Sequence, residues 1–327
     1  MRLSCRLAWA AGAVSLSLLI VLSGCSETVA PPAPKPVESD APETAAETPP
    51  ARESQEEAPG ERLTAIGAMW KADDAGNITL VDLTKGKATD ADLQWIGRLE
   101  YLKSLKLTGP EITDAGLAHL GGLRRLKVLG LDDAAVADAG LEAVKPLEAL
   151  EELYLTRAGV TDAGMEHLAG LTKMRRMRLR GTKITDAALA QLKPLQNLED
   201  IDLSETAVSD EGLVHLKELP KLTRLNLWTT AVTDEGLATL AEMAQLAWLN
   251  LDNDKISDAG LPKLAALSNL TFLHLGRTQI TDAGLDSILA LKGLKEVHVT
   301  NTAVTEEGAK RLKEGLPEAK VLSGAHP

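Results

Sequence analysis

The sequence predicts an α/β solenoid in which short strands and short helical segments alternate along the chain. The first observation is a period of 24 residues that runs from about residue 78 to about residue 317 without an insertion or deletion. The second is the unit Thr-Asp-Ala-Gly-Leu, which occupies residues 113–117, returns intact at residues 281–285 and has variants at every intermediate multiple of 24. A fixed period of this length is typical of a solenoid, in which each unit packs only on its neighbours.

The third observation is that each repeat divides into two halves with different hydrophobic spacing. The first half reads Leu-x-x-Leu-x-Leu, as at Leu222, Leu225 and Leu227, and the alternation of its last three positions predicts a short strand. The second half has apolar residues three apart, as at Leu213 and Leu216, and predicts a short helical segment. One strand and one helical segment per repeat would bury a continuous core between stacked repeats.

This pattern resembles the leucine-rich repeat family, and the resemblance covers ten repeats over residues 78–317. It implies a horseshoe with parallel strands on the concave face and short helices on the convex face. The unit Ile/Val-Thr-Asp-x-Gly-Leu is similar to the cysteine-containing class found in F-box proteins. No F-box precedes the repeats, so a ubiquitin-ligase role is not implied. The place that this class gives to Asn or Cys is mostly Thr, namely Thr182, Thr206, Thr230, Thr278 and Thr302.

Residues 1–25 are typical of an N-terminal processing signal. Arg2 and Arg6 precede an apolar stretch at residues 7–22, which is shorter than the roughly 20 residues of a membrane-spanning helix. The tetrapeptide at residues 22–25, Leu-Ser-Gly-Cys, resembles the lipobox of bacterial lipoproteins. The resemblance implies cleavage before Cys25, acylation of that cysteine, and a place in the bacterial cell envelope, at the outer membrane or the periplasmic face. The alternative is an ordinary secretory signal in which Cys25 is incidental.

The segments on either side of the repeats have different compositions. Residues 26–60 hold eight of the fifteen prolines and a net charge of −6, which predicts a disordered tether. Residues 61–77 predict an N-terminal cap, and residues 318–327 a C-terminal cap or tail. The apolar residues of the N-terminal cap show helical spacing; they are Leu63, Ile66, Met69 and Trp70.

Charge and cysteine content exclude several classes of function. The formal net charge is −12, so the chain is a poor candidate for binding nucleic acid. Loss of Cys5 with the signal peptide leaves Cys25 as the one cysteine, so the mature chain forms no internal disulfide. No motif for a cofactor or for nucleophilic catalysis is readable.

A column of aspartates recurs every 24 residues, from Asp90 to Asp282. We interpret it as structural, because the Asp, or the Thr before it, stands where a residue caps a helical segment. A catalytic site would need one copy only, so we expect no enzyme activity. The glycine two residues after each Asp is expected to allow close packing, and Ala188 replaces one such glycine. His274 and His298 occupy equivalent positions of neighbouring repeats, but no third ligand column accompanies them, so we predict no metal site.

The outward positions of the predicted strands differ between repeats and are candidates for partner recognition. Four of the few aromatic residues fall there, and polar side chains surround them. The predicted binding residues are Tyr154, Arg176, Arg178, Arg224, Asn226, Trp228, Trp248, Asn250, Phe272 and His274. The alternative is that Trp228 and Trp248 only cover each other and the neighbouring strands. The arginines at residues 175–180 face acidic residues one repeat away, which favours an internally neutralised charge stripe over an anion site.

The sequence therefore predicts a lipid-anchored envelope scaffold that binds a protein through the concave face. Two alternatives remain. One is a glycan-binding module, in which Trp228 and Trp248 form a stacking platform. The other is a structural spacer without a specific ligand.

Overall fold

The computed structural model describes residues 58–324. The chain separates into one unit at residues 1–55 and a second at residues 56–327. The predicted signal peptide, the lipidated Cys25 and nearly all of the predicted tether lie outside the described residues. Between residues 58 and 324, no helix is long and apolar enough to cross a membrane.

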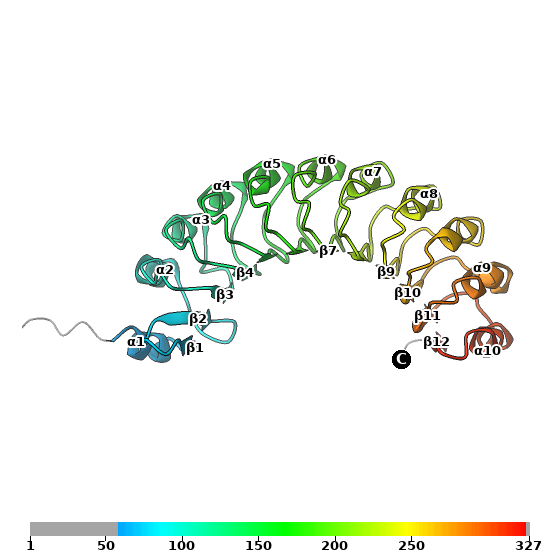
Figure 1. Cartoon of the computed structure of the whole chain (residues 1–327), viewed down its shortest axis with the longest axis horizontal. Coiled ribbons are helices and arrows are strands. Elements are labelled where there is room, and N and C mark those ends of the chain that lie inside the picture. Colours follow the sequence, from blue (N-terminus) through cyan, green and yellow to red (C-terminus); the bar gives the residue numbers. More distant parts are fainter. Residues whose placement is uncertain (1–57, 325–327) are drawn as a thin grey trace, which may run out of the picture. The chain divides into compact units, whose positions relative to one another are not determined.

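The second unit is built on a 12-stranded sheet whose strands follow one another in chain order. β1 (Met69–Ala72) pairs antiparallel with β2 (Ile78–Asp82), and every later neighbour is parallel. The later strands are β3 (Ser104–Thr108), β4 (Val128–Asp132), β5 (Glu152–Tyr154), β6 (Arg176–Arg178), β7 (Asp200–Asp202), β8 (Arg224–Asn226), β9 (Trp248–Asn250), β10 (Phe272–His274), β11 (Glu296–Thr300) and β12 (Lys320–Gly324). Figure 1 shows these strands along the inner side of an arc.

Short helical segments line the outer side of the arc (Figure 1). They are α2 (Asp90–Ile96), α3 (Asp114–Leu117), α4 (Asp138–Leu141), η1 (Glu142–Val144), α5 (Asp162–Met165), η2 (Glu166–Leu168), α6 (Asp186–Ala190), α7 (Leu213–Leu216), α8 (Gly236–Ala241), η3 (Leu261–Ala266), η4 (Asp282–Gly284), α9 (Leu285–Leu289) and α10 (Glu306–Gly315), where η marks 3-10 helix. The parallel strands and the outer helical layer confirm the predicted solenoid.

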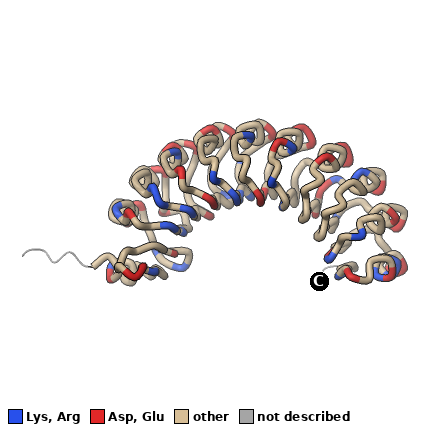
Figure 2. Tube along the Cα trace, viewed as in Figure 1, with Lys and Arg blue, Asp and Glu red and all other residues tan. Residues whose placement is uncertain are grey.

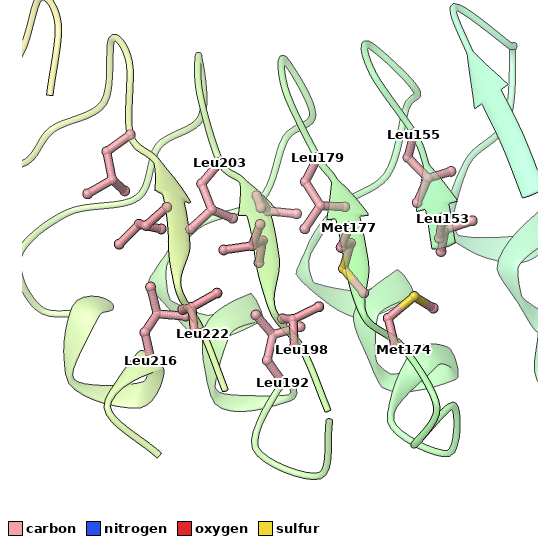
Figure 3. Close-up of a cluster of buried hydrophobic side chains, with 14 of the residues drawn as sticks. Leu153, Leu155, Met174, Met177, Leu179, Leu192, Leu198, Leu203, Leu216 and Leu222 are labelled. Atoms are coloured by element: carbon pink, nitrogen blue, oxygen red, sulfur yellow. The ribbon is translucent and has the colours of Figure 1, made fainter. Parts of the chain in front are cut away.

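The core lies between the two layers and repeats with them. In one repeat Met177, Leu179 and Leu192 are almost completely buried, and Leu198 and Leu203 of the following repeat are equally buried beside them. Figure 3 shows these side chains between the strands and the helical segments. Because each repeat buries its leucines against the next, truncation of one such leucine to alanine is expected to cost about 2–5 kcal/mol.

The aspartate column connects successive repeats. Asp210 accepts hydrogen bonds from the backbone N–H and the hydroxyl of Thr233, at 2.8 and 2.6 Å. Equivalent backbone N–H bonds join every Asp of the column to the Thr, Ser or Ala 23 residues later, and the Thr and Ser residues add a hydroxyl bond. Helix capping belongs to the hydroxyl residue: Thr161 accepts from the N–H of Ala163 at 3.3 Å. The structural interpretation is thus confirmed for the threonines, whereas the aspartates bind the following repeat.

The same aspartate column explains why most repeats have a glycine two residues after the Asp. A methyl group on Gly236 would overlap the carboxylate of Asp210, and the equivalent glycines meet the equivalent aspartates. Where Ala188 stands instead, Asp162 still bonds Thr185 at 2.7 and 2.6 Å. The predicted close packing is confirmed, and one repeat accommodates a methyl group.

The N-terminal cap differs from the sequence prediction. α1 spans Pro59–Ala65, so two residues assigned to the tether belong to the cap. Met69 and Trp70, which helical spacing placed on that helix, lie on β1 instead. Gly67 follows α1 with φ of 78°, which turns the chain back so that β1 pairs with β2.

Candidate binding surface on the concave face

Three positions per repeat face the inner side of the sheet: the first and third strand residues, and the residue two places further on. Strands pair in register, so Arg224 lies beside Trp248 and Asn226 beside Asn250, while Trp248 lies beside Phe272. The concave patch consists of Arg224, Asn226, Trp228, Trp248, Asn250, Phe272 and His274. The remaining predicted residues, Tyr154, Arg176 and Arg178, lie in the same columns on β5 and β6.

The aromatic residues of the patch form a stack along the solenoid. The rings of Trp248 and Phe272 are parallel within 7°, with centroids 4.6 Å apart. The Arg224 guanidinium lies over the Trp248 ring at 4.6 Å. The Phe272 centroid is 5.2 Å from that of His298, which in turn lies 4.3 Å from the ring of His274. Because Arg224 and Phe272 come from the strands on either side of β9, both faces of Trp248 are covered and only its edge meets solvent.

Trp228 is enclosed in a similar way by two arginines. The guanidinium of Arg180 lies 4.5 Å from its ring centroid, and that of Arg277 lies 5.7 Å away. These arginines come from repeats on opposite sides, so both faces of Trp228 are again occupied. Each ring has its own partners, so the structure does not show Trp228 and Trp248 covering each other, whereas it does show both of them packed on neighbouring repeats, as the same alternative expected. The indole N–H of Trp228 is buried without a hydrogen-bond partner among residues 58–324.

The arginines of β6 surround one buried carboxylate. Arg178 donates two hydrogen bonds to Asp200, at 2.6 and 2.8 Å, and Arg176 approaches it at 3.3 Å. Arg224 lies 3.5 Å from the same carboxylate, which is 7% exposed. Burial raises the pKa of Asp200, but the hydrogen bonds and charges of these arginines outweigh it and lower the pKa overall.

Every arginine of the stripe at residues 175–180 has an acidic partner. Besides Asp200, the partners are Glu199 for Arg175, Glu152 for Arg176 and Glu205 for Arg180. The interpretation as an internally neutralised stripe is therefore confirmed. Figure 2 shows acidic and basic residues interspersed on the inner side, whereas Asp and Glu are frequent along the outer turns.

Tyr154 closes this network toward the N-terminus. Its hydroxyl donates to Glu152 at 2.5 Å, and burial together with this acceptor raises the pKa of the phenol. The ammonium group of Lys106 lies 5.9 Å from the centroid of the Tyr154 ring. Gly130 stands between these two residues in the sheet, and its lack of a side chain leaves room for the contact.

Hydrogen bonds to the backbone fix the orientation of the side-chain amides of Asn226 and Asn250. The Oδ1 atom of Asn226 accepts the backbone N–H of Trp228 at 3.2 Å. Asn250 accepts the N–H of Asp252 in the same way, at 3.0 Å. Each amide must therefore direct its Nδ2 group elsewhere, and no hydrogen bond from either Nδ2 occurs within the described part of the chain.

Sequence reasoning missed Asp254, which stands in the column of buried threonines. The hydroxyls of Thr182, Thr206, Thr278 and Thr302 donate to the carbonyl oxygen three residues earlier, at 2.5–2.7 Å. Asp254 instead accepts from the N–H and hydroxyl of Thr230, at 2.7 and 3.0 Å, and its Oδ2 is buried without a partner among the described residues. Burial raises its pKa to about 7. The sequence does carry a signal for this residue, because Asp254 is the one acidic residue in a column that is mostly threonine.

His274 and His298 each bond to a residue two places away on the chain. His298 bonds Glu296 at 2.8 Å, and His274 accepts the N–H of Gly276 at 3.2 Å. Across residues 58–324, no group of three His, Cys, Asp or Glu side chains is placed to hold a metal ion.

A separate depression lies at the N-terminal cap. It has a volume of about 650 Å³ and is lined mainly by apolar groups, including Pro59, Trp70 and Ile78. It belongs to the end of the solenoid and is distinct from the concave patch.

Comparison with known proteins matches residues 88–304 to the family described as leucine-rich repeat region. Among solved structures, an internalin (inlF) from Listeria monocytogenes str. 4b F2365 is similar with a TM-score of 0.51 and 21% identity, over 82% of this chain and 84% of that one. An internalin C2 (inlC2) from the same strain has a TM-score of 0.43 and 23% identity, over 73% and 85% of the two chains. The plant peptide hormone receptor RGFR1, in complex with RGF2, has a TM-score of 0.45 and 14% identity, over 71% of this chain and 42% of the receptor chain. The curated proteins compared contain no match.

Proposed function

Because this chain belongs to the leucine-rich repeat family, we propose that it is a lipid-anchored scaffold of the bacterial cell envelope that binds a protein through its concave patch. Repeat scaffolds of this family are typical protein-interaction modules. The strands align their outward side chains in register over many repeats, which creates an extended surface and no enclosed pocket. The repeated Asp column holds neighbouring repeats together, so it offers no support for catalysis.

The observation that carries the protein-binding proposal is the orientation of the aromatic rings. A sugar stacks its C–H groups on an exposed aromatic face. Both faces of Trp248 are occupied, by Arg224 and Phe272, and both faces of Trp228 by Arg180 and Arg277. The tryptophans present edges beside polar groups, which suits a polypeptide surface better than a glycan.

The envelope location is proposed from the N-terminal sequence. The lipobox-like residues 22–25 and the proline-rich residues 26–60 support an acylated Cys25 and a spacer between membrane and repeats. We also assign the repeats to the cysteine-containing class on their Thr-Asp-x-Gly-Leu unit. Mass spectrometry of the mature N-terminus tests the anchor. We expect an acylated N-terminal cysteine and its loss in Cys25→Ser; an unmodified N-terminus in the wild type would contradict the proposal.

The binding proposal is tested by photo-crosslinking in cells. A benzophenone amino acid replaces Trp248, whose site accepts an aromatic ring. The control position is Val214, which is 44% exposed and lies on α7. We expect one discrete protein adduct from position 248 and none from position 214. Absence of a protein adduct at 248 would overturn the proposal and favour the spacer, whereas an adduct to glycan would favour the glycan module.

A further inference from the structure

The carboxylates beside the concave patch already accept hydrogen bonds, two of them from arginines. Asp200 accepts two hydrogen bonds from Arg178, at 2.6 and 2.8 Å, and one from Arg176 at 3.3 Å. Asp252 is bound through both oxygens by Arg277. Asp202 accepts the N–H and the hydroxyl of Ser204 through Oδ1. Few acceptor atoms on this surface are therefore free to receive a ligand.

Several donors of the same surface are not engaged. The Nδ2 groups of Asn226 and Asn250 make no hydrogen bond within residues 58–324, although both side chains are half-buried and held by their Oδ1 atoms. The Arg224 guanidinium, which lies over Trp248, makes no hydrogen bond there either, and its one ion pair, with Asp200, is long at 3.5 Å. The unsatisfied groups of the patch are thus donors, and one of them is cationic.

The spacing of these donors matches a single carboxylate. Asn226 and Asn250 are register partners on neighbouring strands, which lie about 4.8 Å apart. One acceptor oxygen, or the two oxygens of one carboxylate, can reach both amides from that separation at ordinary hydrogen-bond length. Arg224 lies two residues before Asn226 on the same face, about 6.6 Å along the strand, and adds its positive charge.

The aromatic edges strengthen the preference for an anion. Trp248 flanks the asparagine pair on one side and Trp228 on the other, because they occupy the columns before and after it. The edge of an aromatic ring carries the positive end of its quadrupole. The apolar rings also exclude water, which strengthens hydrogen bonds to the donors between them.

We propose that Arg224, Asn226 and Asn250, between the edges of Trp228 and Trp248, form a recognition site for one carboxylate of the protein partner. This inference rests on the proposed function and adds to it the chemistry of the group that is recognised. The carboxylate belongs to an Asp or Glu side chain or to the chain terminus of the partner, and the adduct peptide distinguishes these sources.

The test uses the full-length protein with the photo-crosslinker at position 248. Asn250→Asp keeps an oxygen for the N–H of Asp252 but replaces the donor group with a negative charge. Gln279→Glu adds the same charge at an exposed position outside the patch. We expect Asn250→Asp to lower adduct yield about 10- to 100-fold and Gln279→Glu to leave it unchanged. The crosslinked partner peptide should carry an acidic residue or the C-terminus within three residues of the attachment point.

The outcomes separate this inference from the proposed function. An adduct that persists in Asn250→Asp, or a partner peptide without a nearby carboxylate, overturns the carboxylate site and leaves protein binding intact. If the chain with the photo-crosslinker at position 248 and Asn250 intact gives no adduct, both are overturned. If Asn250→Asp fails to fold by circular dichroism, Asn250→Ala, which removes the donors without adding charge, should still lower the yield by about 10-fold.

Discussion

Asp254 gives the chain a pH-dependent stability that one substitution should remove. The carboxyl is 3% exposed, and its Oδ2 has no partner within the described residues. Burial is the main cause that raises its pKa from 3.8 to about 7, and the charges of Asp252 and Asp210 act in the same direction. The hydrogen bonds from Thr230 lower the pKa but do not offset the burial.

The direction of the change in stability with pH follows from proton binding to Asp254. Between about pH 4 and 7 the folded chain keeps the Asp254 proton that the unfolded chain has released, so the stability linked to this proton is present in full below pH 4 and is lost as pH rises to 7. Between pH 5 and pH 8 this amounts to about 3 kcal/mol, at about 1.36 kcal/mol per unit of pKa difference. Above pH 7 the effect levels off.

Asp254→Asn is the matched perturbation, because asparagine keeps the acceptor for Thr230 and does not ionise. Urea unfolding at pH 5 and pH 8, followed by circular dichroism, gives the free energy of unfolding for both chains. We expect the wild type to lose about 3 kcal/mol more than Asp254→Asn between these pH values. Equal losses in the two chains would refute the assignment of a neutral carboxyl to Asp254.

Three further substitutions test the repeat contacts and the charge network. Asp210→Ala removes both acceptors of Thr233 and should destabilise the chain by about 1–3 kcal/mol in urea unfolding. Gly236→Ala drives a methyl group into the Asp210 carboxylate and should cost about 1–3 kcal/mol in the same assay. Arg178→Gln removes the two strongest bonds to buried Asp200 and should cost about 1–3 kcal/mol, with thermal unfolding as the measurement.

The first two of these substitutions have a control in the same chain. Asp286→Ala removes an exposed carboxylate that pairs with Arg311, so a change within about 0.5 kcal/mol is expected. Ala188→Gly restores the glycine of the one repeat that lacks it and should relieve no strain. If Asp286→Ala matched Asp210→Ala, the inter-repeat bonds would have no special weight. A neutral Gly236→Ala would contradict the packing argument, and a neutral Arg178→Gln would show that Arg176 and Arg224 suffice for Asp200.

The fold could be predicted because the same hydrophobic pattern recurs in every repeat, so each repeat supports the same assignment of strand and helical segment. Leu225 and its equivalents alternate as strand residues, and the structure buries all of them. The cap was harder to predict, since Met69 and Trp70 occur once and their spacing fits either helix or strand; pairing with β2 decides it. The left-handed residue after each strand was also missed. It is glycine at only two of nine places; the others are Asp133, Arg157, Glu205, Thr229, Asn253, Arg277 and Asn301.

The predicted surface residues were placed together because columns of a regular repeat become neighbours. Their contacts depended on facts that the sequence does not contain. Trp248 stacks on Phe272 in the same column, whereas Trp228 lies in another column and meets Arg180 and Arg277 from two repeats away. The orientation of the Asn250 amide depends on a backbone N–H two residues later, which only the folded turn brings within reach.

The central claim is that the concave patch is the surface on which the partner binds. A photo-crosslinker placed in turn at residues 130, 202, 226, 248, 272 and 298, with residues 70 and 214 as positions away from the patch, measures where the partner lies on the chain. The account predicts one partner whose adduct yield is highest at residues 226–272 and falls toward both ends of the sheet, with little at 70 and 214. A maximum at residue 70, or equal yields at concave and convex positions, would contradict it.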